Sequence, residues 1–353
     1  MMTVFTVMRQ AWALWLLVGL VYVVVPVCDA IFGEDTFNPA PEAVKQLEQD
    51  RFYTCALYAF VVLQWAVTAW GVWMAAQPDL AWHARLGLMM NVGIVNGLGI
   101  NVAHELGHKK GRMDNWMTRI SLLPTCYGHT RVEHNRGHHY MVATPEDPVS
   151  ARFGESFWAF LPRTLIGTLR SAWRLEAKRL SRRGKSVWSL GNEVLLAHAA
   201  TLLMLTGVWL GLGTGALLFM LGQAALAIGL LELVNYVEHY GLLRRKGPDG
   251  RYERCEPEHS WNSSCVVSNL LLFHLQRHSD HHAHPARPYQ VLRHFDSSPQ
   301  LPTGYAGMVM LACWPRRWFA VMNPLVIAHY EGDMSRLNIC PRYHRRYGVA
   351  QAS

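Results

Sequence analysis

The sequence predicts an all-α integral membrane protein with about five transmembrane helices and a histidine-rich cap on the cytoplasmic side. The first observation behind this prediction is composition. Of the 353 residues, 51% are hydrophobic and only 16% are charged, against about 25% charged in globular proteins. The second observation is that long apolar runs alternate with polar, basic stretches. The third is that histidines follow the third and fifth of these runs closely, cluster at 134–139 and cluster again in the C-terminal third.

Five apolar runs approach the roughly 20 residues that a bilayer core requires. They cover roughly residues 11–28, 52–76, 86–103, 193–210 and 215–234. A glycine-rich turn, 211–215, separates the last two runs. The third run contains four glycines, which permit close packing of membrane helices. It leads directly into His104.

Basic residues predict the orientation of these spans. Segment 109–185 is rich in Lys and Arg, and such an excess is expected on the cytoplasmic side of a membrane. The same rule explains the formal charge of +8 better than nucleic-acid binding does. We therefore expect segments 104–185 and 236–353 to be cytoplasmic parts of one integral domain, 1–353. Five spans then place Met1 outside, so we expect relatives to carry a sixth helix before it.

Three further apolar segments are too short to span. Segments 116–127 and 157–169 each contain a proline and are expected to form interfacial or buried helices, and segment 308–318 is equally short. The seven cysteines have no paired spacing and no Cys-x-x-Cys, which favours reduced thiols over a disulfide framework. Any electrons that the protein needs would therefore come from another protein.

The histidine clusters have the spacing of metal ligands. Residues i and i+4 share one face of a helix, so His104 with His108, and His134 with His138, can each hold one ion. His139 lies about 100° around the helix from its neighbour and can reach a second ion. The third cluster repeats the pattern with His278, His281 and His282. One metal cannot use eight imidazoles, but two can.

The ligand type limits the choice of metal. An all-nitrogen set suits iron, copper or zinc, whereas structural zinc sites are closed and often rich in thiolate. Carboxylates next to the ligands are better placed to accept hydrogen bonds from imidazole N–H groups, although salt bridges on a helix surface are the alternative. These predicted acceptors are Glu105, Glu133, Asp147, Glu238 and Asp280.

Four motifs make the sequence resemble one family. Segments His104–Lys109, Glu133–His139, Asn235–Leu242 and Leu275–Pro285 are similar to the motifs of the alkane 1-monooxygenases, within the membrane fatty acid desaturase and hydroxylase superfamily. The resemblance covers most of the chain, from about Val21 to Pro324. It also includes Phe32–Asp35, Leu180–Gly184, His259–Ser263 and Leu301–Tyr305.

The resemblance implies a non-haem di-iron monooxygenase that uses O2 to hydroxylate the terminal methyl group of n-alkanes. It implies electrons from NADH through a reductase and rubredoxin, and an active site on the cytoplasmic side of the bacterial inner membrane. No catalytic residues beyond the iron ligands are expected. The implied ligands are His104, His108, His134, His138, His139, His239, His278, His281 and His282; His239 depends mainly on the family motif.

Two other functions compete with this one. A related membrane hydroxylase or desaturase would act on arene methyl groups, fatty acyl chains or other hydrocarbons. A non-catalytic metal protein would be a transporter or a haem carrier, but transporters place ligands at mid-membrane, and these histidines follow the ends of the apolar runs. For the enzymes we expect an apolar substrate channel between the helices, with the linings Val21, Val25, Leu98 and Ile228.

Overall fold

The computed structural model describes residues 11–344. Within this part of the chain the structure contains helices and four isolated bridges, but no strand, which confirms the predicted all-α class. The described chain divides into two compact units. The first comprises 11–27, 49–132 and 173–231, and the second comprises 28–48, 133–172 and 232–344.

Among the described residues, four helical stretches are long and apolar enough to cross a membrane, so the chain is a multi-pass membrane protein. The first, Trp12–Phe32, is a succession of short helices: η1 (Ala11–Trp15), α2 (Leu16–Gly19), η2 (Leu20–Val24) and α3 (Val25–Phe32). The others are α5 (Arg51–Ala75), α6 (Trp82–Gly107) and α11 (Glu193–His239).

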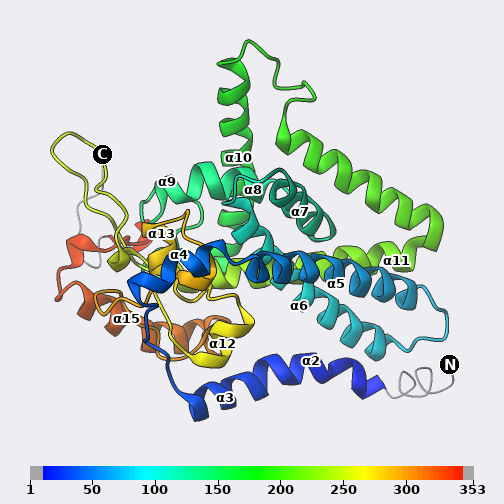
Figure 1. Cartoon of the computed structure of the whole chain (residues 1–353), viewed down its shortest axis with the longest axis horizontal. Coiled ribbons are helices and arrows are strands. Elements are labelled where there is room, and N and C mark those ends of the chain that lie inside the picture. The colour runs from blue at the N-terminus through cyan, green and yellow to red at the C-terminus, as the bar shows by residue number, and fades with distance from the viewer. Residues whose placement is uncertain (1–10, 345–353) are drawn as a thin grey trace. The chain divides into compact units, whose positions relative to one another are not determined.

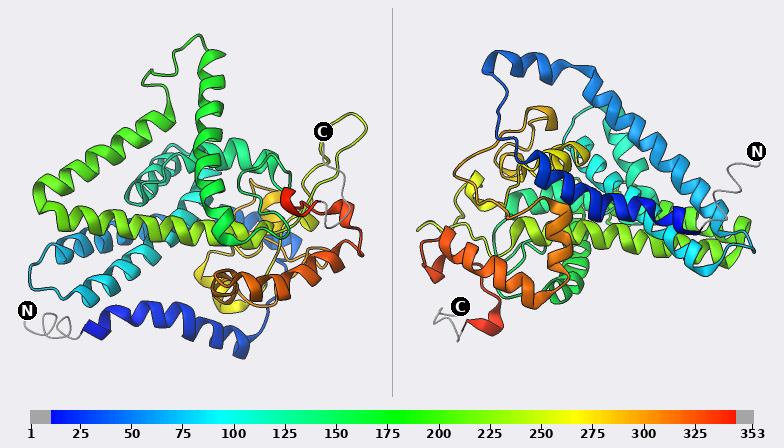
Figure 2. Two further views of the ribbon diagram at one scale, coloured as in Figure 1. Left: turned by 180° about the vertical axis from the view of Figure 1, so that it is seen from behind. Right: turned by 90° about the horizontal axis from the view of Figure 1, so that it is seen from below.

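The longest of these helices, α11, is broken at Gly213. This residue has φ 84° and ψ 179°, a backbone conformation that only glycine adopts without strain. The 47-residue element therefore consists of two helical arms, 193–212 and 214–239, and the chain reverses between them (Figures 1 and 2). The break lies inside the glycine-rich turn that the sequence predicts between the fourth and fifth spans.

In the first unit, α5 and α6 form an antiparallel pair, followed by α7 (Arg112–Leu122) and η3 (Leu123–Thr125) (Figure 1). Glycines of α6 allow other helices to come close. A Cβ added at Gly93 would lie 2.8 Å from the Cβ of Leu226 in α11, so a larger residue there would push the two helices apart. The predicted role of these glycines in packing is therefore visible in the structure.

The second unit is built mainly from shorter helices. The predicted short helix at 157–169 is the first part of α10 (Phe157–Ser181). It is longer than expected, because the chain continues through good helix formers to Ser181. The α13 helix (His278–Ala283) is central to this unit. The other helices are α4 (Pro41–Gln49), α8 (Thr130–Glu133, which crosses from the first unit), η4 (His134–His138), α9 (His139–Met141), α10 (Phe157–Ser181), η5 (Pro257–His259), α12 (Val266–Leu271), η6 (Tyr289–Val291), α14 (Tyr305–Ala312), α15 (Pro315–His329), η7 (Met334–Arg336) and η8 (Pro341–Tyr343).

Candidate metal centre

The α13 helix presents histidines from a buried position. All six of its residues are buried, and its imidazoles point in two directions. His278 and His282 are one turn apart, and their Nε2 atoms lie 2.9 Å from each other. The Nε2 atom of His281 lies instead 3.1 Å from that of His139. One short helix therefore contributes to two groups of nitrogens, as the His278 cluster predicts.

The first group contains four buried histidines of the second unit. His138, His239, His278 and His282 each offer a ligand nitrogen, and these nitrogens all lie within 4.8 Å of one another. The Nε2 atoms of His239 and His278 are 3.3 Å apart. His239 has no exposed surface, so it is a core member of the group although its spacing in the sequence gives no hint of this.

The second predicted histidine cluster folds differently from the expectation. Residues His134–His138 form a π-helical turn, η4, in which the backbone N–H of His139 bonds to the carbonyl of His134. The wider turn brings His134 and His139 onto one face, with their Nε2 atoms 2.9 Å apart. His138 faces the four-histidine group instead. The prediction that His134 and His138 hold the same ion is therefore wrong, because it assumed α-helical spacing.

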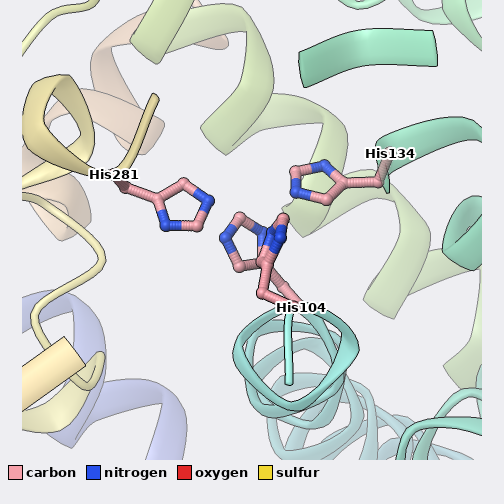
Figure 3. A group of neighbouring side chains, drawn as sticks. His104, His134 and His281 are labelled. Carbon is pink, nitrogen blue, oxygen red and sulfur yellow. The ribbon is translucent and has the colours of Figure 1, made fainter. Parts of the chain in front are cut away.

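The second group in this unit consists of His134, His139 and His281. The rings of His134 and His281 stack nearly parallel, with centroids 6.3 Å apart. Figure 3 shows these two rings approaching from different segments of the chain. Because Nε2 of His139 lies within 3.1 Å of both partners, three imidazoles can offer nitrogens to one ion.

Geometry and charge state both fit a metal. Two nitrogens about 2.1 Å from one ion, at angles of about 90–110°, lie roughly 3.0–3.4 Å apart, which matches the separations within the four-histidine group. The Nε2 atom of His138 is buried and has no hydrogen-bond partner within residues 11–344. Burial and the neighbouring histidines lower the pKa of His282 well below its usual value, so this imidazole is neutral, the form that binds metals.

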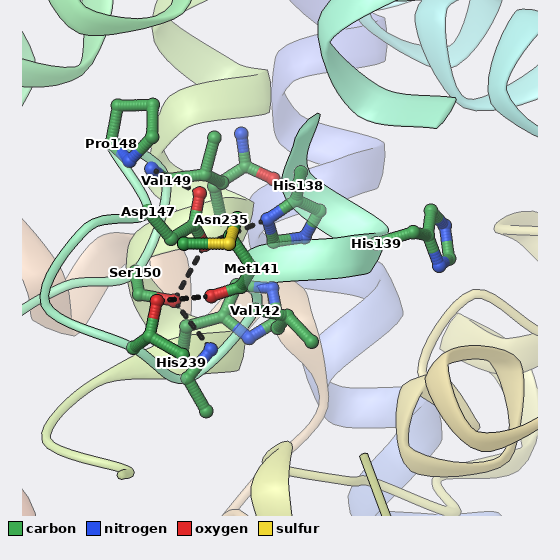
Figure 4. Close-up of polar contacts among 12 residues, drawn as sticks. His138, His139, Met141, Val142, Asp147, Pro148, Val149, Ser150, Asn235 and His239 are labelled. Atoms are coloured by element: carbon green, nitrogen blue, oxygen red, sulfur yellow. Dashed lines mark hydrogen bonds and ion pairs between the residues drawn. The ribbon is translucent and has the colours of Figure 1, made fainter. Parts of the chain in front are cut away.

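Asp147 orients one of the ligands. Its carboxylate lies 2.9 Å from Nδ1 of His138 and accepts a hydrogen bond of 2.7 Å from the hydroxyl of Ser150 (Figure 4). Burial alone would raise the pKa of Asp147, but the charge of His138 and the hydrogen bonds from His138 and Ser150 outweigh it and hold the pKa below its usual value. The ionised carboxylate therefore fixes Nε2 of His138 toward the other imidazoles.

Glu238 lies against the converging nitrogens. One carboxylate oxygen is 3.1 Å from Nε2 of His278, and the other accepts a hydrogen bond of 2.8 Å from the hydroxyl of Tyr305. Burial and Glu238 raise the pKa of Tyr305 well above its usual value, so the phenol stays protonated and donates. The sequence predicted Glu238 only as an acceptor of hydrogen bonds from imidazole. In this position its carboxylate oxygen could also serve as a metal ligand beside the four-histidine group. The role of Tyr305 was missed, although the residue lies in the Leu301–Tyr305 motif.

Comparison with known proteins decides the family. A model of the fatty acid desaturase family matches residues 80–312. The chain is 48% identical over 318 residues to the alkane 1-monooxygenase of Pseudomonas putida, covering 90% of this chain and 79% of that protein. It is 46% identical over 354 residues to alkane 1-monooxygenase 1 of Alcanivorax borkumensis, covering 98% and 87%. The chain belongs to the fatty acid desaturase family, among the alkane 1-monooxygenases.

A more distant relative is named for different substrates. The hydroxylase component of xylene/toluene monooxygenase from Pseudomonas putida is 29% identical over 245 residues, which cover 67% of this chain and 63% of that protein. The greater identity and coverage therefore lie with the alkane 1-monooxygenases, as the motifs of the sequence predict.

The remaining predicted carboxylates have varied surroundings in this member of the family. Asp280 accepts hydrogen bonds from Arg287, from the backbone N–H of Arg293 at 2.8 Å and from Nδ1 of His284 at 2.9 Å. These partners are not predicted ligands, so the structure corrects the expected role of Asp280: it braces α13 rather than a ligand ring. Glu133 is buried, and burial together with nearby acidic groups raises its pKa well above its usual value.

In the first unit, His104 and His108 lie at the C-terminal end of α6. Their ring centroids are 5.2 Å apart, which confirms that the i, i+4 spacing places them on one face. Figure 3 shows His104 projecting from the end of this helix. Glu105, between them, forms an ion pair of 3.8 Å with Lys109.

The residues predicted to line a substrate channel all lie in the first unit. Val25 is buried, whereas the other three are half-buried. The half-buried residues are Val21, Leu98 and Ile228. The role of all four residues in lining a channel stays a prediction.

Proposed function

We propose that the protein is a membrane monooxygenase that hydroxylates the terminal methyl group of n-alkanes. The observation that carries this proposal is the convergence of four buried imidazoles, from His138, His239, His278 and His282, in a chain that belongs to this family. The relatives named above are alkane 1-monooxygenases, and we extend that activity to this chain.

We further propose two iron ions as the cofactor. Their ligands would be the four-histidine group and the group of His134, His139 and His281. We add the α6 pair, His104 and His108, because the family motif and the i, i+4 spacing include it. When bound, iron supplies the activation of O2 and the oxidation of the C–H bond. In the net reaction, one oxygen atom enters the methyl C–H bond and the other leaves as water, which consumes two electrons and two protons.

The chain's own residues prepare this chemistry. Asp147 holds the ring of His138 in one orientation, and Tyr305 holds the carboxylate of Glu238 against His278. All four imidazoles of the first group are at most 4% exposed, so bulk water is kept from their nitrogens. The apolar spans would hold a hydrocarbon chain dissolved in the membrane.

The electrons must come from a partner. The seven cysteines are all free and have no metal-thiolate spacing, so we propose rubredoxin and an NADH-linked rubredoxin reductase as the electron donors. We place the protein in the bacterial inner membrane with its histidines on the cytoplasmic side, because the basic residues of 109–185 favour that orientation.

A direct test uses the purified full-length protein. We expect two iron ions per chain, and 1-octanol when octane, O2, NADH, rubredoxin and its reductase are supplied. An olefin as product would indicate a desaturase. Turnover of xylene but not octane would favour the activity for which the more distant relative is named. A preparation without iron, inactive after iron is restored, would support the non-catalytic alternative.

A further inference from the structure

The second unit carries an exposed apolar surface that the proposed reaction does not use. Its centre consists of Trp158, Met310 and Trp314, whose exposed fractions are 58%, 39% and 66%. The indole N–H of Trp158 donates a hydrogen bond of 3.1 Å to the carbonyl of Cys313. This bond joins the first turn of α10 to the connection between α14 and α15, so the three side chains form one patch, here called the Trp158–Trp314 surface.

The patch continues along both helices. On α10, Ile166 and Leu169 are exposed and follow Trp158 at helical spacing, while the opposite face buries Phe160. On α15, Val321 is exposed one turn after Arg317. Helices with an exposed apolar stripe beside a basic one are typical of elements that lie in the interface of a membrane.

Two cations border the apolar centre. Arg316 and Arg317, in the first turn of α15, are both exposed. Among the described residues, neither forms an ion pair or a hydrogen bond through its guanidinium. A pair of unneutralised arginines beside two exposed tryptophans matches the composition of membrane interfaces, where indoles lie at headgroup level and basic residues contact anionic lipid.

We propose that the Trp158–Trp314 surface binds the anionic phospholipid surface of the bilayer, with the indoles among the upper acyl chains and Arg316 and Arg317 on lipid phosphates. The membrane is the occupant that the chain itself supplies, because its spanning helices hold the protein at a bilayer. The charge of the two arginines selects anionic over neutral lipid. The histidine-bearing unit would thereby have a membrane contact of its own, in addition to the spanning helices.

Cross-linking tests the contact directly. The full-length protein, carrying Trp314→p-benzoylphenylalanine, is reconstituted in nanodiscs that contain phosphatidylglycerol and is then irradiated. We expect lipid adducts at this position and none at Arg251→p-benzoylphenylalanine, a control in the same unit whose native side chain is 88% exposed. Adducts to a polypeptide in place of lipid, or equal labelling at both positions, would overturn the proposal.

A second measurement tests the charge. Native mass spectrometry compares retained phosphatidylglycerol with retained phosphatidylcholine for Arg316→Gln/Arg317→Gln and for Arg245→Gln/Arg251→Gln, which has the same change of charge in the same unit. Since each interfacial arginine is worth about 1 kcal/mol, or about fivefold, the first variant should lose most of the preference and the second should keep it. An equal loss in both variants would mean that total charge, not this surface, selects the lipid.

Discussion

Two buried polar clusters in this molecule differ in how their hydrogen-bonding groups are satisfied. The first unit contains an amide cluster formed by Gln64, Asn96, Ser121 and Gln223, with Thr68 at its edge. The second contains the four-histidine group. All members of both clusters are at most 4% exposed, so burial alone does not separate them.

The amide cluster is complete within the protein. Gln64 donates to Asn96 at 2.8 Å and to the carbonyl of Ser121 at 2.9 Å, and it accepts from the Ser121 hydroxyl at 2.6 Å. Asn96 donates to Gln223 at 2.6 Å. A Cβ at Gly99 would lie 2.2 Å from the Gln64 amide nitrogen, which explains why glycine is needed where this amide crosses α6.

The histidine group is not complete within the protein. In the described part of the chain, the side chains of His239 and His282 have no hydrogen-bonding neighbours except other imidazoles, and Nε2 of His138 has none. A buried polar atom without a partner costs about 1–3 kcal/mol. A group that contains several such nitrogens therefore requires a further binding partner. The difference indicates that the amide cluster holds helices together, whereas the histidine group is built for a metal.

The largest effect that would separate the two clusters is loss of a ligand. We expect His138→Ala to lose the iron of the four-histidine group and all measurable alkane hydroxylation, because the substitution removes one of the four nitrogens that converge there. Iron per chain, measured by plasma mass spectrometry, checks this. His344→Ala is the control, since within residues 11–344 the hydrogen bond of that ring goes to the carbonyl of Ile339. Full iron content in His138→Ala would exclude this residue from the ligand set.

Metal removal should distinguish the clusters in the unaltered protein. We expect a chelator to lower the unfolding temperature, because a metal that binds only the folded state stabilises it by mass action. Re-addition of iron should restore the original value. The same treatment of His138→Ala should produce a smaller shift, since the four-histidine group no longer holds iron in this variant. A chelator shift of equal size in this variant would show that the stabilising metal binds elsewhere.

The sequence predicted which histidines come together better than it predicted how they are grouped. The α6 pair and His278 with His282 follow α-helical spacing, so the i, i+4 rule placed them correctly. His134 and His138 were assigned to one ion because nothing in their spacing reveals a π-helical turn, which depends on tertiary packing. Asp280 was expected to orient a ligand because it lies beside the ligands in the sequence. Its actual partner, Arg287, is brought to the carboxylate by the fold, which the sequence does not reveal.

The same limit applies to the amide cluster. Gln64, Asn96 and Gln223 lie in three different apolar helices, and single polar residues in such helices carry no spacing signal. Only the register of the packed helices brings them together. The break at Gly213, by contrast, was predicted within a few residues, because a local run of glycines determines it.

An intermediate effect is expected from Asp147→Asn. The amide keeps the shape of the carboxylate but removes the charge that holds the His138 ring, and loss of such an orienting partner lowers metal affinity about 10–100-fold. Competition with a chelator of known affinity measures this. Asp249→Asn, at the exposed Asp249 (64%), provides the matched control. An unchanged affinity would show that Asp147 does not orient the ligand.

A smaller effect on a different property is expected from Gln64→Leu. The substitution removes the Gln64 donor from the carbonyl of Ser121 and from the oxygen of Asn96, which keeps only the longer 3.4 Å bond from Thr68, and such a loss costs about 1–3 kcal/mol. We therefore expect a lower unfolding temperature but the normal iron content per folded chain. Gln77→Leu, just after the C-terminal end of α5, is the control, because it makes the same change where the amide donates to the carbonyl of Trp73 at 3.0 Å. Loss of iron at normal stability would contradict the assignment of this cluster to helix packing.

The smallest effect should come from Thr68→Val. Valine has the shape of threonine, and Asn96 would lose its 3.1 Å and 3.4 Å hydrogen bonds with the Thr68 hydroxyl while keeping Gln64 and Gln223 as partners. Single hydrogen bonds between membrane helices contribute about 0.6 kcal/mol on average, so the unfolding temperature should fall only slightly. If Thr68→Val destabilises the protein as much as Gln64→Leu, the amide cluster acts as one cooperative unit, and its stability cannot be divided among separate hydrogen bonds.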